Sequence, residues 1–383
     1  MLIDFFDSIP PLLYSTIYYI VLMIFCLIIA FLYLSSFNNE RVLRSSSISK
    51  IIAIILSLFV IVFIGLRPVS GIAFIDMYLY NHSYVNILQD YVPIDFHEEW
   101  LWDNFSYFCK DIGLSNRDYF LVIDAIYFGL MLVACWRLMR NNLLLAVLFC
   151  FVSFSCFTYG VNGLRNGMAC SILMLSITFL KKNNIAELCV ALLLMITSIS
   201  IHRSTMLPAV CAIAALTFVR KTEWAIAFWG ISILISLVAG NSIAEFFSNF
   251  GFDDRMSQYA NLNEIGEINT NIEYDVGFRW DFLIYSMMPI IMVWYVTVKR
   301  NFKDNMYNII SITYILANAF WVMVIRSNQS NRFAYLSWFL YPLVIAYPLL
   351  RMNIWENQDR KTGLILLAYS GFTFFMQFIY YGR

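Results

Sequence analysis

Residues 12–34 read LLYSTIYYIVLMIFCLIIAFLYL and contain no charged side chain. A helix of about 20 apolar residues is long enough to cross a bilayer, because the hydrocarbon core is about 30 Å thick and a helix rises about 1.5 Å per residue. This stretch therefore predicts a membrane-spanning helix.

Comparable apolar runs follow along the whole chain. We predict about twelve spans, at residues 12–34, 51–66, 119–138, 143–159, 164–180, 185–200, 206–219, 224–240, 282–298, 306–324, 333–350 and 363–380. The sixth and seventh are short. The composition agrees, since 61% of the 383 residues are hydrophobic and 13% are charged, against about 25% charged in soluble domains. The sequence predicts an all-α polytopic membrane protein with one integral domain, residues 1–383.

The loops predict the orientation of the helices. Basic residues in loops normally mark the cytoplasmic face, and fifteen of them fall in six alternate loops. With these loops inside, both termini lie outside. Two long external loops, residues 67–118 and 241–278, are then expected to cap the outer face, and 96–108 has the pattern of an amphipathic interfacial helix.

The charge and the cysteine pattern exclude several classes of function. The formal net charge is zero, so the chain has no general attraction to nucleic acid. The eight cysteines contain no Cys-x-x-Cys pair, and the three histidines stand at unrelated positions. We therefore predict no metal site and no cofactor.

The external loops are unusual in the kind of basic residue they carry. They hold nine arginines but only Lys110, whereas the other seven lysines are inside. The planar guanidinium forms paired hydrogen bonds to phosphate and carboxylate, which lysine does not. The imbalance predicts an anionic ligand outside the membrane, and a lipid-linked diphosphate is the leading candidate.

The second span ends in Gly65-Leu66-Arg67-Pro68, and Asp76 is the first external carboxylate after a span. Glycine and proline allow a sharp exit from the helix at this boundary. We predict that Arg67 and Asp76 belong to the site. The alternative is an Arg67–Asp76 ion pair that pins the loop.

Two further stretches place polar groups at helix ends. In Asn162-Gly163-Leu164-Arg165-Asn166, a spacing of i, i+3, i+4 puts Asn162, Arg165 and Asn166 on one helix face, where the positive end of the dipole suits an anion. Their alternative role is hydrogen bonding between helices. Between the sixth and seventh spans, His202 is either a proton acceptor or a structural hydrogen-bonding group, and Arg203 is a candidate substrate contact.

The remaining candidates lie later in the chain or inside a span. Arg279 and Asp281 begin the ninth span, as a binding pair or as a local salt bridge beside an interfacial tryptophan, and Arg326 and Arg332 flank a polar loop that is otherwise a solvated turn. Tyr80 is a candidate for stacking on a sugar ring. Asp124 lies within the third span, where a carboxylate needs a partner, so we expect it to support one of the arginines.

These residues, in this order, resemble the Wzy/EpsG group of bacterial O-antigen and exopolysaccharide polymerases. The resemblance rests on Gly65-Leu66-Arg67, Asp76, Tyr80, Leu164-Arg165-Asn166-Gly167-Met168-Ala169, His202-x-Ser204, Phe278-Arg279-x-Asp281 and Asn331-Arg332. At Asn166 the group often has glutamine, which is also an amide.

The resemblance implies a GT-C-like glycosyltransferase in the bacterial inner membrane with its site facing the periplasm. It implies undecaprenyl-diphosphate-linked oligosaccharide as the substrate, membrane lipid as the surroundings and a chain-length regulator as a partner. In the mechanism we expect, Arg165 and Arg279 hold the diphosphate, supported by Arg67 and Arg332, with Asp76 as the first candidate base and His202 as the second.

Three other functions fit a multi-pass protein that binds a lipid diphosphate or lipid. A flippase or transporter normally has ionisable residues near the midplane and inverted repeats, whereas these arginines lie at one edge. An O-antigen ligase differs in its acceptor. A membrane-bound acyltransferase would have a histidine deep within a helix.

Overall fold

A computed structural model describes residues 2–35, 47–87, 99–181, 184–249, 278–326 and 331–380, except the side chains of 2, 241–249 and 331. Every regular element in these ranges is helical, which confirms the all-α prediction. Much of the two predicted external loops, residues 88–98 and 250–277, lies outside the described residues.

The chain divides into two compact units, each described here by itself. Unit 1 comprises residues 1–179, 189–202 and 346–383, and unit 2 comprises residues 180–188 and 203–345. The single domain inferred from the sequence stays a prediction.

Within the described ranges, eight helices are long and apolar enough to cross a membrane, so this is a multi-pass membrane protein. Three further apolar helices are shorter: Leu164–Ile177, Ile185–Ile201 and Arg203–Thr217. The span predicted at 119–138 and the first half of the one predicted at 143–159 lie in one helical stretch, Asn116–Phe151, which is interrupted by a 3-10 turn at Arg140–Asn142. The rest of the second predicted span includes a separate short helix, Cys156–Val161. The count of twelve crossings therefore stays a prediction, while the shortness of the sixth and seventh helices is confirmed.

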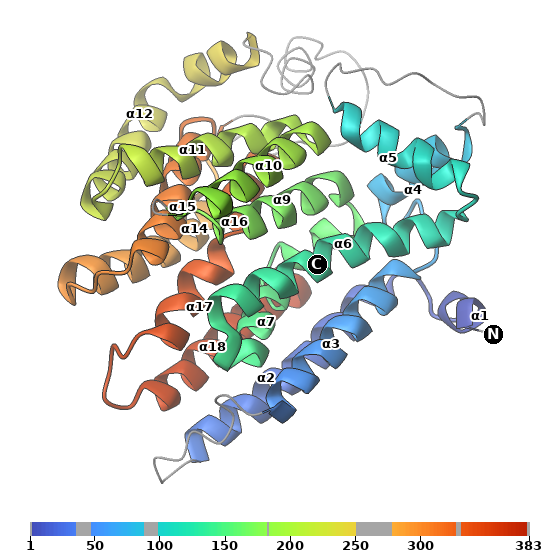
Figure 1. The fold of residues 1–383 in the computed structure, drawn as a ribbon, viewed down its shortest axis with the longest axis horizontal. Helices are drawn as coiled ribbons and strands as arrows, with labels where there is room; N and C mark the ends of the chain where they lie inside the picture. The colour runs from blue at the N-terminus through green and yellow to red at the C-terminus, as the bar shows by residue number, and fades with distance from the viewer. Residues whose placement is uncertain are drawn as a thin grey trace. The chain divides into compact units, whose positions relative to one another are not determined.

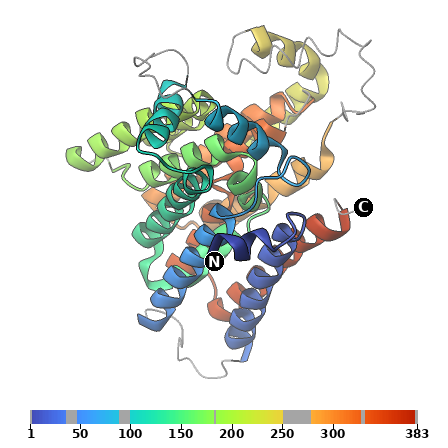
Figure 2. The same ribbon diagram turned by 90° about the vertical axis from the view of Figure 1, so that its right-hand side faces the viewer.

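Unit 1 is built on two packed helix pairs. The helix α2 (Leu13–Ser35) packs along α18 (Gln358–Phe375), which continues into a π-helical turn, Met376–Tyr380. Figure 2 shows these helices together although they stand near opposite ends of the sequence. The second pair is α3 (Ser47–Gly65) with α6 (Asn116–Met139), visible side by side in Figure 1.

Glycine permits the close approach of α3 and α6. A Cβ atom at Gly65 would lie 2.8 Å from Leu121 Cα, a distance that real contacts do not allow. The other face of α6 packs on α9 (Leu164–Ile177), and α7 (Leu143–Phe151), α8 (Cys156–Val161) and α10 (Ile185–Ile201) complete the core of this unit. The end of α3 thus lies directly against α6.

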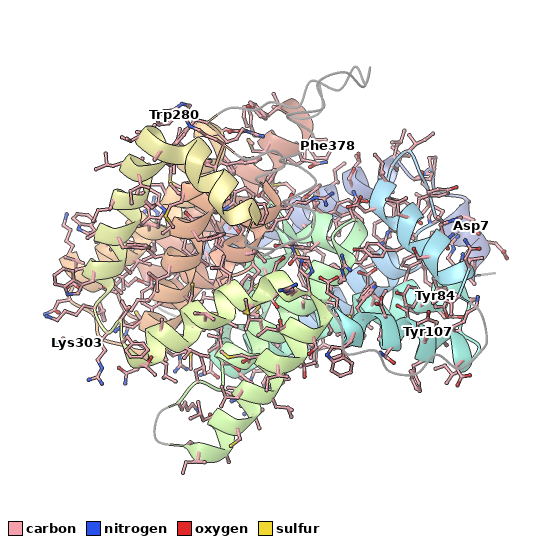
Figure 3. All side chains as sticks on the ribbon, turned by 90° about the horizontal axis from the view of Figure 1, so that it is seen from above. Asp7, Tyr84, Tyr107, Trp280, Lys303 and Phe378 are labelled. Atoms are coloured by element: carbon pink, nitrogen blue, oxygen red, sulfur yellow. The ribbon has the colours of Figure 1, made fainter. Side chains whose placement is uncertain are left out.

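Two short helices surround the beginning of α6. They are α4 (Ile75–Val85) and α5 (Trp100–Asp111), labelled in Figure 3 by Tyr84 and Tyr107. The Tyr84 ring stacks on Tyr119 of α6 at 4.0 Å between centroids, and Ser106 of α5 hydrogen-bonds Tyr119 at 2.8 Å. These contacts hold α4 and α5 against the first turn of α6.

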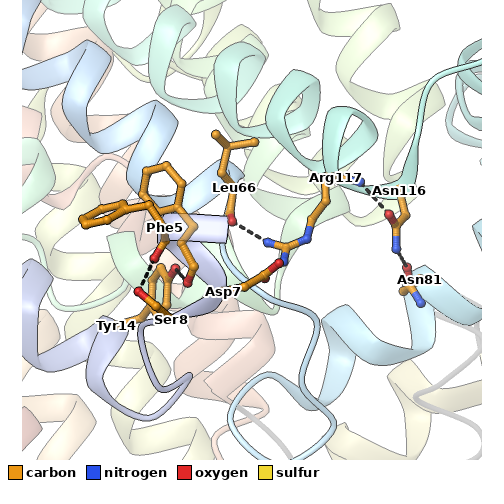
Figure 4. Close-up of polar contacts among 9 residues, drawn as sticks. Phe5, Asp7, Ser8, Tyr14, Leu66, Asn81, Asn116 and Arg117 are labelled. Atoms are coloured by element: carbon orange, nitrogen blue, oxygen red, sulfur yellow. Dashed lines mark hydrogen bonds and ion pairs between the residues drawn. The ribbon is translucent and has the colours of Figure 1, made fainter. Parts of the chain in front are cut away.

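The amino-terminal helix α1 (Leu2–Asp7) is attached at the same end of α6. Arg117 forms an ion pair with Asp7 and donates to the Leu66 carbonyl, and Asn116 donates to Asn81 at 2.9 Å (Figure 4). The segment between α3 and α4 is therefore held to the start of α6 at both of its ends, through Leu66 and through Asn81.

Unit 2 is organised around α15 (Asn305–Met323). Its neighbours are α11 (Met206–Thr217), α12 (Thr222–Asn249), α14 (Trp280–Val293) and α16 (Asn331–Trp338). Figure 3 labels Trp280 at the start of α14 and Lys303 beyond the π-helical turn Trp294–Lys299 that extends it. A 3-10 turn, Arg203–Thr205, precedes α11, and α17 (Tyr341–Arg351) runs from this unit into unit 1.

A buried polar network joins four helices of unit 2. Trp229 of α12 donates to Asn318 of α15 at 2.8 Å, and Asn318 donates to Ser337 of α16 at 2.9 Å. The next residue, Trp338, donates to Ser286 of α14 at 2.8 Å. Hydrogen bonds between helices are one of the forces that hold membrane bundles together, since lipid provides no hydrophobic drive for helix association.

Candidate functional site

Three helix ends of unit 1 meet at one carboxylate. Glu99 immediately precedes α5, Arg165 lies in the first turn of α9, and His202 follows the last residue of α10. One Glu99 oxygen forms an ion pair with Arg165 Nη1, and the other contacts His202 Nδ1. The structure thus brings together two of the three predicted catalytic residues, Arg165 and His202, through a third group.

This cluster is only partly accessible. The exposed fraction of the side chain is 17% for Glu99, 18% for Arg165 and 14% for His202. Partial burial strengthens the interaction between charges relative to water while leaving an approach for a ligand. One turn along α5, burial raises the pKa of Asp103 against the opposing charge of Arg165, and Glu99 raises it further.

The turn between α8 and α9 sets the position of Arg165. The Thr158 carbonyl accepts hydrogen bonds from the amides of both Asn162 and Gly163, each at 2.9 Å. Gly167 allows the two helices to meet tightly, because a Cβ there would lie 3.0 Å from the Tyr159 carbonyl oxygen. The guanidinium is therefore held at the end of a constrained turn.

The expected common face of Asn162, Arg165 and Asn166 needs correction. Asn162 ends α8 and α9 begins only at Leu164, so Asn162 does not belong to the same helix. Arg165 and Asn166 do occupy the first turn of α9, and Asn166 accepts a hydrogen bond from the Cys170 thiol at 3.1 Å. The spacing suggested one continuous helix, but a short polar turn at residues 162–163 separates α8 from α9.

Asp76 and Tyr80 lie on α4, one turn apart and both partly buried. The Tyr80 ring meets Trp102 of α5 edge-on at 5.5 Å, so it packs beside the helix that follows Glu99. Their roles as base and sugar contact stay predictions.

Arg67 has different surroundings from Arg165. Its side chain is fully buried and forms an ion pair with Asp124 at 2.8 Å, which confirms that Asp124 partners one of the arginines. The guanidinium also donates to the carbonyls of Ile64 at 2.6 Å and Val161 at 3.2 Å. Burial lowers the pKa of Arg67 and Asp124 opposes that shift. Its predicted contact with substrate stays untested.

The other four predicted arginines belong to unit 2. Arg279 forms a bidentate pair with Asp281, at 3.0 and 2.7 Å, and lies 3.9 Å from the Phe282 ring centroid. Arg326 lies over Phe278 at 6.0 Å, Arg203 is exposed in the turn before α11, and Arg332 is in the first turn of α16. The local salt bridge between Arg279 and Asp281 is confirmed, and the substrate roles of these residues stay predictions.

Glu99 is the residue that sequence reasoning missed. It stands in an acidic stretch with Glu98 and Asp103, and no local pattern separates one carboxylate from the others. The amphipathic helix predicted at 96–108 placed Glu99 within it, whereas in the structure the helix begins at Trp100 and Glu99 lies just before it. Among the described residues, no group of three or more histidine, cysteine or acidic side chains has the arrangement of a metal site.

The arrangement can support acid–base chemistry beside an anion site. With Nδ1 facing a carboxylate, the neutral imidazole carries its proton on Nδ1 and its lone pair on Nε2, which makes Nε2 the proton-accepting atom. Arg165 adds a cationic group at a helix amino terminus, a place that favours phosphate.

A family model, that of the EpsG family, matches residues 50–383, and the chain belongs to this family. Membership indicates an exopolysaccharide- or O-antigen-polymerase type of function. The match includes most of α3 and all the helices after it. No curated protein and no solved structure matches the chain.

Proposed function

We propose that this protein is a membrane glycosyltransferase that polymerises oligosaccharide repeat units carried on undecaprenyl diphosphate, at the periplasmic face of the bacterial inner membrane. The observation that carries the proposal is the shared carboxylate of Glu99, which holds Arg165 and His202 at one half-buried place. Family membership supports the class of reaction.

In this mechanism His202 is the general base and Arg165 stabilises the leaving group. The acceptor hydroxyl of one repeat unit attacks C1 of the sugar at the reducing end of the growing chain, and its proton passes to His202 Nε2. The bond between C1 and the diphosphate oxygen breaks, and the lipid diphosphate leaves with the electron pair. Arg165 binds the diphosphate more tightly as its negative charge develops, which lowers the barrier.

Glu99 acts on both of its partners in the proposal. It orients the imidazole through Nδ1 and stabilises the imidazolium that forms when His202 accepts the proton. It also occupies Arg165 before a substrate diphosphate is present. The sequence had favoured Asp76 as the base. We now favour His202, because its ring contacts a carboxylate and shares that carboxylate with Arg165.

The test uses purified protein in nanodiscs supplied with its lipid-diphosphate-linked repeat unit, with product chain length read on a gel. Arg165→Ala should lower the elongation rate by about 100- to 1,000-fold, because it removes a preorganised charge at the leaving group. Arg351→Ala removes an exposed arginine at the end of α17 and should elongate normally.

Two results would contradict the proposal. Normal elongation by Arg165→Ala, at a normal protein level, would exclude this residue from the site. Movement of the lipid-linked unit across a vesicle bilayer by the wild-type protein, with no joining of two units, would identify a transporter instead.

A further inference from the structure

The fully buried Arg67–Asp124 pair lies in unit 1 outside the Glu99 cluster and has no part in the chemistry above. Both side chains have an exposed fraction of 0%. Removing two charges from water is costly, and a buried pair is seldom more stable than well-packed apolar residues of similar volume. A contribution to stability therefore does not account for the pair, which points to a role in function.

The hydrogen bonds of Arg67 show what it joins. One nitrogen, Nη1, binds the Ile64 carbonyl at the end of α3 and the Asp124 carboxylate in α6, and the other, Nη2, binds the Val161 carbonyl at the end of α8. The planar, rigid guanidinium fork fixes these directions relative to one another. Phe74 and Phe120 lie 5.7 Å from its central carbon and enclose it.

Val161 is four residues before Arg165. The carbonyls at a helix end need partners outside the helix, and Arg67 supplies one for the end of α8. The next two amides, of Asn162 and Gly163, bind the Thr158 carbonyl. The turn that carries Arg165 is therefore fixed both from the Arg67 side and internally.

We propose that Arg67 and Asp124 are positioning residues, which clamp the α8–α9 turn and thereby place Arg165 for the diphosphate. This inference rests on the proposed function of Arg165. In this proposal Arg67 acts by holding the turn before Arg165, whereas its sequence position had suggested a direct contact with the substrate.

The decisive variant is Arg67→Met/Asp124→Leu, measured in the nanodisc elongation assay. It replaces the pair with apolar groups of similar size, so no uncompensated charge stays buried. A displacement of about 1 Å at a catalytic group costs on the order of 100-fold in rate, so kcat should fall by about that factor while KM for the lipid-linked unit changes little. Arg67→Lys keeps the charge without the fork and should fall between this variant and the wild type.

A matched control is Arg137→Met. Arg137 lies in the last turn of α6 and donates to Thr178 at 2.9 Å, so it is also an arginine hydrogen-bonded within unit 1, although as a residue it is exposed. Its hydrogen-bond partner, Thr178, lies at the other end of α9 from the α8–α9 turn, so kcat of this variant should stay at the wild-type value.

Hydrogen exchange supplies a readout independent of activity. In the double variant, amides of residues 158–167 should exchange faster, while those of α11, Met206–Thr217, should not change. The proposal would be overturned if the double variant showed unchanged exchange at residues 158–167 and a kcat equal to that of the Arg137→Met control. A large rise in KM with unchanged exchange would also overturn it, in favour of direct substrate binding by Arg67.

The remaining outcomes are also informative. If the double variant fails to accumulate, the same two measurements on Arg67→Lys decide between these results. Full activity of Arg165→Ala would refute the proposed function alone, since the exchange experiment would still show whether Arg67 holds the turn.

Discussion

Two arginine–carboxylate pairs in unit 1 come from similar sequence contexts, yet their surroundings differ completely. Arg67 and Asp124 are both 0% exposed, whereas Arg165 and Glu99 keep 18% and 17% of their side chains exposed. Arg67 binds two carbonyl groups in addition to its carboxylate, and Glu99 binds a histidine in addition to its arginine. An arginine at the end of an apolar run can thus be part of the structure or open to a ligand, and its contacts distinguish the two.

The largest difference between the pairs should appear in stability. Arg67→Ala leaves Asp124 buried and unpaired, which costs about 3–5 kcal/mol and should deplete the folded protein in membranes. Arg165→Ala breaks a partly exposed pair, and we expect a loss of about 1 kcal/mol at most. Thermal unfolding in detergent measures both. Equal losses would mean that burial does not separate the two pairs.

The next expected effect is on the rate. Glu99→Gln keeps the shape of the side chain but weakens its hold on Arg165 and no longer stabilises the imidazolium form of His202. We expect kcat to fall about 100-fold, the lower end of what a positioned base contributes. Asp103→Asn, one turn along α5, is the matched control and should change kcat only a few-fold. Similar losses from both variants would show a general effect of negative charge on this helix.

A smaller effect should follow from separating the helices that hold the buried pair. Gly65→Ala introduces a Cβ atom 2.8 Å from Leu121 Cα, and overpacking of this kind costs about 1–3 kcal/mol. Gly129→Ala is the control on α6, because no atom lies within 4 Å of its added Cβ, and it should stabilise the helix by up to about 1 kcal/mol. Thermal unfolding of the two variants should therefore shift in opposite directions, and shifts in the same direction would argue against close packing at Gly65.

The smallest effect concerns the pair in unit 2. Arg279→Lys loses the bidentate hydrogen bonding to Asp281, which is only two residues further along the chain. With 26% and 22% of the side chains exposed, the change in stability should stay below about 1 kcal/mol. A loss of stability as large as that of Arg67→Ala would mean that the Arg279–Asp281 pair contributes as much as the buried Arg67–Asp124 pair.

The predictions made from the sequence succeeded where a local pattern was sufficient. Apolar runs identified the helices at 12–34 and 51–66 because membrane thickness sets a length that the sequence displays directly. Asp124 required a partner because a lone carboxylate within a span is costly, and the structure provides Arg67. The predicted Arg279–Asp281 salt bridge formed because its partners are neighbours in sequence.

The sequence was less informative where the fold joins distant segments. The partner of Arg67 is 57 positions away, at Asp124, rather than the nearby Asp76 that we considered. Glu99 meets His202 across 103 positions, and such a pairing leaves no periodic trace. The number of spans was also difficult to read, because the polar residues at 140–142 separate two predicted spans, whereas in the structure they form a 3-10 turn within one helical stretch, Asn116–Phe151.

The sequence by itself determined that this chain is helical and crosses a membrane several times, since both properties follow from runs of apolar side chains and from the length of a helix. It also supplied the arginines at the ends of those runs. Only the tertiary structure decided that Arg67 is enclosed while Arg165 shares Glu99 with His202. The physical reason is that burial and ion pairing depend on which helix ends meet in space, and helix ends far apart in sequence meet only when the bundle packs.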